Sequence, residues 1–82
     1  MSIESNINIM QKKDLYKIVG KNIQKQRLIQ GYTQETFAEL MGVSWSYVSK
    51  IEAGILNLSL GKILEIADYL NIEVDLLLKT KN

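Results

Sequence analysis

The sequence predicts an all-α domain built from five helices, most of them short. Apolar residues recur at intervals of three and four along residues 14–78, which is the helical period, and no run alternates convincingly enough to be a strand. Capping residues precede the first four segments, and glycine or asparagine follows them. Helices this short do not hold together alone in water, so each must bury one face against the others. With 82 residues, the chain is expected to form one domain of packed, non-parallel helices.

The first helix is expected to begin at Asp14 and to stop at Gly31. Asp14 is a reasonable N-cap, and Gly31 can adopt the left-handed conformation that follows many helices. The apolar residues at helical spacing are Leu15, Ile18, Val19 and Ile23. Residues 1–13 follow neither period, and we predict an arm that is mobile or becomes ordered only on a partner. The domain boundaries are therefore predicted at 1–13 for the arm and 14–82 for the helical domain.

The remaining helices are predicted from caps and spacing in the same way. The expected N-caps are Thr33, Ser44 and Ser59, and the expected helix ends are Gly42, Gly54 and Asn71. The apolar positions are Phe37, Ala38, Leu40 and Met41 in the second helix, Val48 and Ile51 in the third, and Leu60, Ile63, Leu64, Ala67 and Leu70 in the fourth. A last short helix over about residues 74–78 is expected to cover the core.

The composition excludes several classes of protein. The chain has no cysteine and no histidine, so it offers no disulfide, no thiolate metal site and none of the usual zinc ligands. The sequence contains no nucleophile–base pair, metal cluster or phosphate loop, and we expect neither an enzyme nor a bound metal, cofactor or small-molecule substrate. No apolar run approaches the roughly 20 residues of a membrane span, and no signal peptide is recognisable. A cytoplasmic protein without membrane contact is therefore expected.

The net charge is only +1, but it is unevenly distributed. Residues 11–30 carry six Lys or Arg residues against Asp14, a local charge of +5, whereas residues 31–54 carry Lys50 against three glutamates, a local charge of −2. A basic first helix is typical of a protein that binds a polyanion, and it is equally typical of an ordinary solvated surface. The charge alone therefore does not choose between these two interpretations.

The stretch from Gln34 to Ala53 has the spacing of two helices that meet steeply across a tight turn. Ala38 is small where the second helix must cross the first, and Gly42, four residues on, can supply the positive φ of the turn. The residues expected to pack inward are Phe37, Met41, Val43, Val48 and Ile51. The residues expected to face outward on the second of these helices are Trp45, Ser46, Tyr47, Ser49 and Lys50.

From about Ile18 to Leu78, the sequence resembles the phage-repressor helix-turn-helix domains of the Cro/CI or XRE type. The residues that carry the resemblance are Ile23, Arg27, Gly31, Thr33, Gln34, Glu35, Phe37, Ala38, Met41, Gly42, Val43, Ser44, Tyr47, Val48, Ser49, Lys50, Ile51, Glu52, Gly54, Ser59, Leu64, Ile66, Ala67 and Leu70. The resemblance implies a five-helix, lambda-repressor-like DNA-binding domain whose recognition helix begins at Trp45. One departure is the loop at residues 55–59, which lacks the basic residues and the proline that the family often carries there.

By this resemblance, the recognition helix lies in the major groove with its N-terminal half nearest the base edges. Trp45, Ser46 and Ser49 are then the candidates for base contacts, and Lys50 can reach guanine or phosphate. Trp45 can pack against a thymine methyl group, or it can be a partly buried anchor or a protein contact, and both interpretations stay open. Ser44, which caps this helix, belongs to the same predicted DNA-binding set.

The resemblance implies roles for residues outside the recognition helix as well. Gln34, at the N-terminus of the second helix, is expected to clamp a DNA phosphate, and Tyr47 and Asn57 are expected to contact phosphates too. Ser59 is expected mainly to cap its helix. Arg27 and Glu52 are implied to form a structural ion pair between the first helix and the end of the recognition helix. The expected dimer contact consists of the last apolar residues, Leu76, Leu77 and Leu78.

These features predict a sequence-specific transcriptional regulator that binds a two-fold symmetric operator in double-stranded DNA as a homodimer. A phage or mobile-element repressor, or a controller protein of a restriction-modification system, fits a chain of this length. The alternative is a protein-interaction module on the same fold, such as an antitoxin or a regulator-binding protein, that would use Trp45, Ile55 and Leu56 against protein. The local charge of −2 over residues 31–54 keeps this alternative open.

Overall fold

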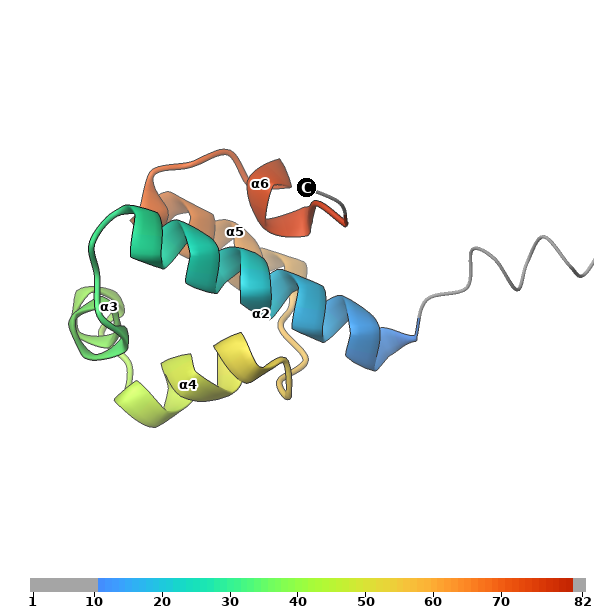
Figure 1. Ribbon diagram of the computed structural model, residues 1–82, viewed down its shortest axis with the longest axis horizontal. Helices are drawn as coiled ribbons and strands as arrows, with labels where there is room; N and C mark the ends of the chain where they lie inside the picture. The colour runs from blue at the N-terminus through green and yellow to red at the C-terminus, as the bar shows by residue number, and fades with distance from the viewer. Residues whose placement is uncertain (1–10, 81–82) are drawn as a thin grey trace, which may run out of the picture.

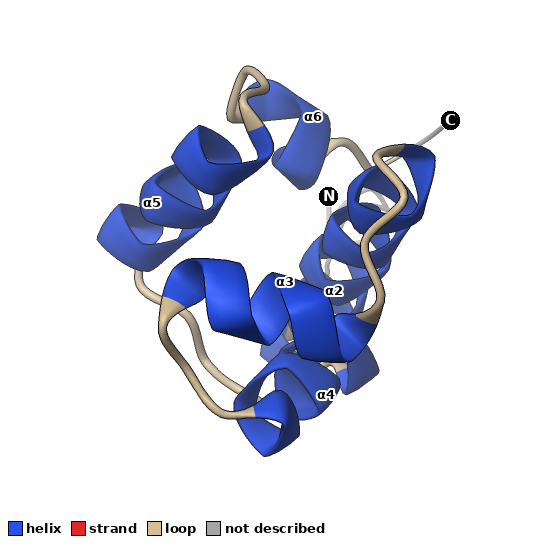
Figure 2. Cartoon of the chain, turned by 90° about the vertical axis from the view of Figure 1, so that its left-hand side faces the viewer, coloured by secondary structure: helices blue, strands red, loops and turns tan. Residues whose placement is uncertain are grey.

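The computed structural model describes residues 11–80, which form five α-helices and no strand (Figures 1 and 2). The helices are α2 (Lys12–Ile29), α3 (Gln34–Met41), α4 (Trp45–Ala53), α5 (Leu60–Leu70) and α6 (Asp75–Leu78). Figure 1 shows α4 and α6 on opposite sides of α2, and α2 contacts α4, α5 and α6. The predicted all-α fold class is confirmed. Within the described residues, no helix is long and apolar enough to cross a membrane.

The first helix begins earlier than its predicted start. Gln11 is the N-cap of α2, and the carboxylate of Asp14 accepts a hydrogen bond from the Gln11 backbone N–H at 3.3 Å. The prediction that Asp14 is the N-cap is therefore wrong. Asp14 is the third residue of the helix, and its carboxylate accepts a hydrogen bond from the backbone of the N-cap residue. Lys12 and Lys13, which we assigned to the arm, belong to the helix. The rest of the predicted arm, residues 1–10, lies outside the described residues.

The caps of the next three helices are confirmed. The hydroxyls of Thr33, Ser44 and Ser59 each accept a hydrogen bond of 3.0 Å from a backbone N–H three residues on. All three helices end at residues in the left-handed conformation, namely Gly42, Gly54 and Asn71. The tight turn between α3 and α4 depends on Gly42, which has a φ of 70°. Glycine adopts this backbone conformation without the steric strain that a residue with a side chain would have.

All five helices contribute side chains to one hydrophobic core. Its buried members are Val19, Ile23, Phe37, Ala38, Val48, Ile51, Ile63, Ile66, Ala67, Leu70 and Leu77. Leu60 and Leu64, which we expected to face the core, are 76% and 52% exposed, whereas Ile66 is fully buried. The error arose because α5 is apolar on more than one face, so its spacing fits two orientations about the helix axis. Leu15 and Leu40 are likewise exposed at the edges of α2 and α3.

The last helix corrects one of the predicted dimer contacts. Leu77 is fully buried against the core, whereas Leu78 is 37% exposed and Leu76 is half-buried. Successive residues of a helix point about 100° apart, so only one of the three leucines can face the core directly. Asn22 of α2 holds this helix in place, because its buried side-chain amide donates to the backbone carbonyls of Leu77 and Lys79, both at 2.9 Å. Leu77 therefore cannot be part of a dimer surface.

The contact between α2 and α4 is unusually close. A Cβ atom added at Gly20 would lie 2.9 Å from the carbonyl oxygen of Glu52 and would collide with that of Ile51. Since glycine has no Cβ, the backbones of the two helices can approach to this distance. The orientation of α4 is thus set directly by the backbone of α2.

Candidate nucleic-acid interface

The helix α4 has one buried face and one exposed face. Val48, Ile51 and Glu52 are buried against the rest of the molecule. The opposite face is solvent-exposed and consists of Trp45, Ser46, Ser49, Lys50 and Ala53. The helical period placed five residues outward, and four of them lie on this face, whereas the fifth, Tyr47, is half-buried. This surface carries one charge, that of Lys50, together with two hydroxyl groups and the indole of Trp45.

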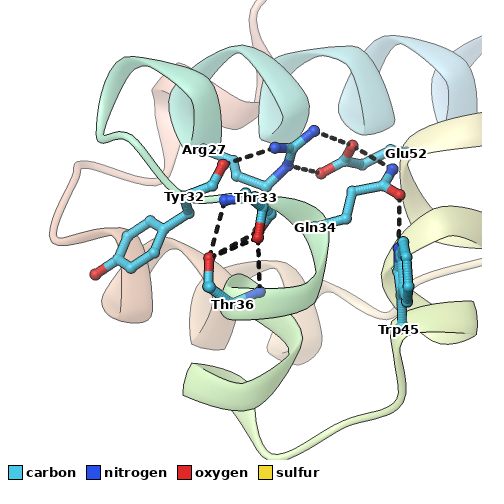
Figure 3. Close-up of polar contacts among 7 residues, drawn as sticks. All are labelled: Arg27, Tyr32, Thr33, Gln34, Thr36, Trp45 and Glu52. Carbon is cyan, nitrogen blue, oxygen red and sulfur yellow. Dashed lines mark hydrogen bonds and ion pairs between the residues drawn. The ribbon is translucent and has the colours of Figure 1, made fainter.

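Beneath this surface, Arg27 of α2 and Glu52 of α4 form a buried ion pair (Figure 3). The guanidinium Nε and Nη2 donate to the two carboxylate oxygens of Glu52, at 2.6 Å and 2.9 Å. Arg27 also donates through Nη1 to the backbone carbonyl of Tyr32, at 2.8 Å. A bidentate pair of this kind fixes both the distance and the orientation of its partners. The structure thus joins α2 to the C-terminal half of α4 through the two residues that the resemblance singled out.

The ion pair extends outward to the surface through Gln34. The Gln34 side-chain amide donates through Nε2 to Glu52 Oε1 at 3.0 Å, and its Oε1 accepts a hydrogen bond from the indole Nε1 of Trp45 at 3.0 Å. Figure 3 shows the four side chains in sequence, from the buried guanidinium to the exposed indole. Gln34 is therefore placed at the N-terminus of α3 as expected, but both ends of its amide group are bonded within the protein. One Nε2 hydrogen, of the two that the amide carries, is used in this way.

This network satisfies its own polar groups. Glu52 accepts three hydrogen bonds, two from Arg27 and one from Gln34. Within the described part of the chain, no buried side-chain nitrogen or oxygen lacks a hydrogen-bond partner. Fully satisfied buried networks are rigid, because any rearrangement leaves a polar group unpaired in a low-dielectric environment. The C-terminal part of α4, which carries Glu52, is consequently held in one orientation relative to α2, and the exposed bond of Trp45 to Gln34 links the N-terminal end of α4 to α3.

The other predicted contact residues lie around this surface. Ser44 is exposed, and its hydroxyl caps α4. Tyr47 is not fully outward, because its half-buried ring packs against the core beside Met41 and Val43. Asn57 is exposed in the loop between α4 and α5.

At the start of α5, Lys62 is paired with a neighbouring carboxylate. Its Nζ lies 2.9 Å from Glu65 Oε1. The hydrogen bond and the charge of Glu65 raise the pKa of Lys62 above its ordinary value. Lys62 therefore keeps its positive charge, but the carboxylate of Glu65 largely offsets it, so Lys62 adds little positive charge near the loop between α4 and α5.

Two features of this site were missed in the sequence. Ala53 shares the exposed face of α4, and its position in the helical period, eight residues after Trp45, was a signal that could have identified it. The bonds of Gln34 to Glu52 and Trp45 had no such signal, because they join residues 18 and 11 positions apart between two helices, α3 and α4.

A second surface feature is an apolar groove at the N-terminal end of α2, which we call the leucine groove. It has a volume of about 110 Å³ and is lined by Leu15, Tyr16, Val19, Leu56, Asn57, Leu58, Leu60, Ile63 and Leu78. The loop that follows α4 thus forms one wall, while α2, α5 and α6 form the others. Leu15, Leu60 and Leu78 are large apolar side chains exposed at its edges.

Comparison with known proteins places these features in a family. The sequence matches the helix-turn-helix family over residues 23–77. It is 43% identical over 59 residues to YazB of Bacillus subtilis (strain 168), described as an uncharacterized HTH-type transcriptional regulator. That match covers 72% of this chain and 86% of YazB.

Two solved structures share both the fold and part of the sequence. The restriction-modification controller protein C.AhdI from Aeromonas hydrophila is 39% identical and superposes with a TM-score of 0.69, covering 76% of this chain and 94% of C.AhdI. The hypothetical transcription factor NHTF from Neisseria is 28% identical with a TM-score of 0.74, covering 88% of this chain and 83% of NHTF.

Proposed function

This chain belongs to the helix-turn-helix family of DNA-binding transcriptional regulators, and we propose that it binds a two-fold symmetric operator in double-stranded DNA as a homodimer. The N-terminal half of α4 enters the major groove in this proposal. The observation that carries it is the exposed polar face of α4, held in one orientation by the buried ion pair of Arg27 and Glu52 and by the partly buried bond of Gln34 to Glu52. Since bacterial DNA lies in the cytoplasm, we propose that location for the protein too.

Each exposed residue of α4 has a proposed role in the groove. Ser46 and Ser49 can donate and accept hydrogen bonds, so they contact base edges without dictating one base. Lys50 contacts guanine or a phosphate. Gln34 contacts a phosphate through its second Nε2 hydrogen and is supported by the free backbone N–H groups in the first turn of α3. Ser44, Tyr47 and Asn57 are proposed as further phosphate contacts at the edges of this face.

The exposed face of α4 presents few positive charges to DNA, which supports the dimer. Only Lys50 is cationic on the exposed face of α4, and Lys62 is paired with Glu65. Since affinity at a given salt concentration depends on the number of phosphates neutralised, one subunit alone should bind weakly at physiological salt. Two subunits double these contacts and match half-sites about one helical turn apart, roughly 34 Å.

The leucine groove is the proposed dimer contact. Leu15 and Leu60 at its edges take the place of the buried Leu77, and Leu78 keeps its proposed role. The half-buried Leu76 stays a proposed contact on α6, although it does not line the groove. A second copy seated there buries apolar surface that a monomer leaves in water. Because the loop after α4 lines this groove, such a dimer also brings the C-terminal ends of two α4 helices near each other.

Selection from a random pool of double-stranded DNA tests the function. We expect enrichment of one inverted repeat with half-site centres about 10 base pairs apart. The similarity to a restriction-modification controller supports a regulator of that type, and a repressor of a phage or mobile element is the neighbouring possibility on the same fold. An enriched sequence without two-fold symmetry would contradict the dimer but not the DNA binding.

The second candidate function is protein binding on the same fold. Trp45 and Ile55 are exposed, and Glu35 and Glu39 on the exposed side of α3 give that helix an acidic surface. A selection that enriches no DNA sequence at all would favour this function over regulation through DNA.

A further inference from the structure

Trp45 is the largest side chain on the exposed face of α4, and 56% of its surface is exposed. It is the first residue of the helix, at the end that the proposed function places nearest the base edges. Together with Gln34, Ser46 and Ser49 it lines an open depression on this face. The groups that Trp45 can offer in this depression therefore bear directly on which base it would contact.

The hydrogen-bonding capacity of Trp45 is already used. An indole has one donor and no acceptor, and here that donor is bonded to Gln34 Oε1 at 3.0 Å (Figure 3). The oxygen of Gln34 must face Trp45, because the other end of the amide faces the carboxylate of Glu52, which can only accept. Turning the amide over would set oxygen against carboxylate and N–H against N–H, so both bonds would be lost together.

The direction of the Gln34 amide is in turn fixed from below. Glu52 is buried and bound by two guanidinium nitrogens of Arg27. The carboxylate cannot turn away from Gln34 without giving up the ion pair. Trp45 is therefore left with an apolar ring face and ring edge, and with no polar group free for a base.

The one apolar substituent that an unmodified base presents in the major groove is the C5-methyl group of thymine. We propose that Trp45 determines specificity by packing against a thymine methyl group in each half-site, without a hydrogen bond to the base. This inference rests on the proposed function of α4 in DNA binding. The same contact would accept 5-methylcytosine, which carries its methyl group at the same ring position.

The size of the effect follows from the burial of one methyl group. Transfer of a group of this size out of water changes affinity about fourfold. If both half-sites are changed together in a symmetric operator, the two effects multiply to about fifteenfold. These changes are large enough to measure by titration at constant salt.

The experiment uses the operator obtained by selection with the wild-type protein. Each thymine is replaced, together with its symmetry-related thymine in the other half-site, by deoxyuridine, which lacks the methyl group but keeps every hydrogen-bonding group. We expect one symmetric pair of positions at which the wild-type protein loses about fifteenfold in affinity and Trp45→Ala loses nothing further. Ser49→Ala is the matched control on the same helix, and it should keep the full ratio between thymine and deoxyuridine whatever its overall affinity.

A second measurement needs no variant, because Trp45 is the only tryptophan in the chain. Binding to the thymine operator should change the fluorescence of the indole, and the change should be smaller with deoxyuridine at the sensitive position. Cytosine at that position should weaken binding, and 5-methylcytosine should restore part of the loss.

The outcomes separate this inference from the function on which it rests. If selection enriches no sequence, the proposed DNA-binding function fails. If an operator is found but deoxyuridine has no effect at any position, or the same effect on wild type and Trp45→Ala, the proposed role of Trp45 is overturned while the DNA-binding function stands.

Discussion

Glu52 is the residue at which the polar contacts beneath α4 meet. It accepts hydrogen bonds from Arg27 and Gln34, and through Gln34 it orients Trp45. Removing one member of a buried ion pair leaves the other charge unpaired in a low-dielectric environment, which destabilises the protein strongly. At the residue scale, the stability of the fold and the presentation of α4 therefore depend on the same few side chains.

Replacing Arg27 by alanine should mainly lower the stability of the fold, because Arg27 is buried. The unpaired carboxylate of Glu52 is expected to reduce the free energy of unfolding by about 3 kcal/mol or more. In a chain this small, the melting temperature should fall by at least about 10 °C. Lys25→Ala, on the exposed side of the same helix, is the control and should melt within a few degrees of the wild type. An unchanged melting temperature for Arg27→Ala would remove the ion pair from this account.

Replacing Lys50 by alanine should weaken DNA binding and leave the fold intact. Lys50 is exposed, and the loss of one well-made contact to a phosphate or guanine is expected to cost about 1–3 kcal/mol of binding free energy. If the contact is to phosphate, the slope of log affinity against log salt should fall by about 0.9 per subunit. Lys79→Ala, beyond α6, has the same charge change on the far side of α2 and should bind like the wild type. Equal affinities and slopes for both variants would exclude Lys50 from the interface.

The helices themselves differ in how far they could be predicted. Their ends depend on neighbouring residues, so Thr33, Ser44 and Ser59 could be identified as caps from the sequence. The helical period also identified most of the exposed face of α4, although it put the half-buried Tyr47 there and missed Ala53. By contrast, the orientation of α5 and the burial of Leu77 depend on what the other helices cover, and the bonds of Gln34 depend on how α3 and α4 meet. Information of that kind is not present in local spacing.

The close contact between α2 and α4 makes Gly20 a sensitive position. Gly20→Ala would press a methyl group against the carbonyl oxygens of Ile51 and Glu52, and overpacking of this kind is expected to cost about 1–3 kcal/mol of stability. Gly61→Ala is the matched control in α5, where the nearest atom to an added Cβ is Ser59 Oγ at 3.9 Å. The control should gain up to about 1 kcal/mol, because alanine favours the helix. Melting temperatures that shift in the same direction for both variants, relative to the wild type, would contradict this packing.

At the scale of the whole molecule, the proposed dimer depends on apolar surface that the single chain leaves exposed. Leu15, Leu60 and Leu78 lie at the edges of the leucine groove, whereas Leu77 is fully buried in the core. Substitution by a charged residue should therefore have different effects at the exposed leucines and at the buried one. This difference separates the loss of the dimer from the loss of the fold.

Leu60→Glu should give a folded monomer, because its side chain is already exposed, whereas Leu77→Glu should prevent folding. Sedimentation would report the mass and circular dichroism the helix content. We expect the wild-type protein to be a dimer at tens of micromolar and Leu60→Glu to bind the operator much more weakly. A wild-type monomer at that concentration that binds one half-site as tightly as the full operator would contradict the dimer.

The central claim, that the exposed face of α4 meets DNA, is tested most directly by an NMR titration that follows each backbone amide. Adding the selected operator should shift the amide signals of residues 44–50 and of Gln34 strongly. The amide signals of α6, on the opposite side of α2, should change little. Shifts centred on α6 or on the acidic side of α3, with α4 unaffected, would contradict the claim.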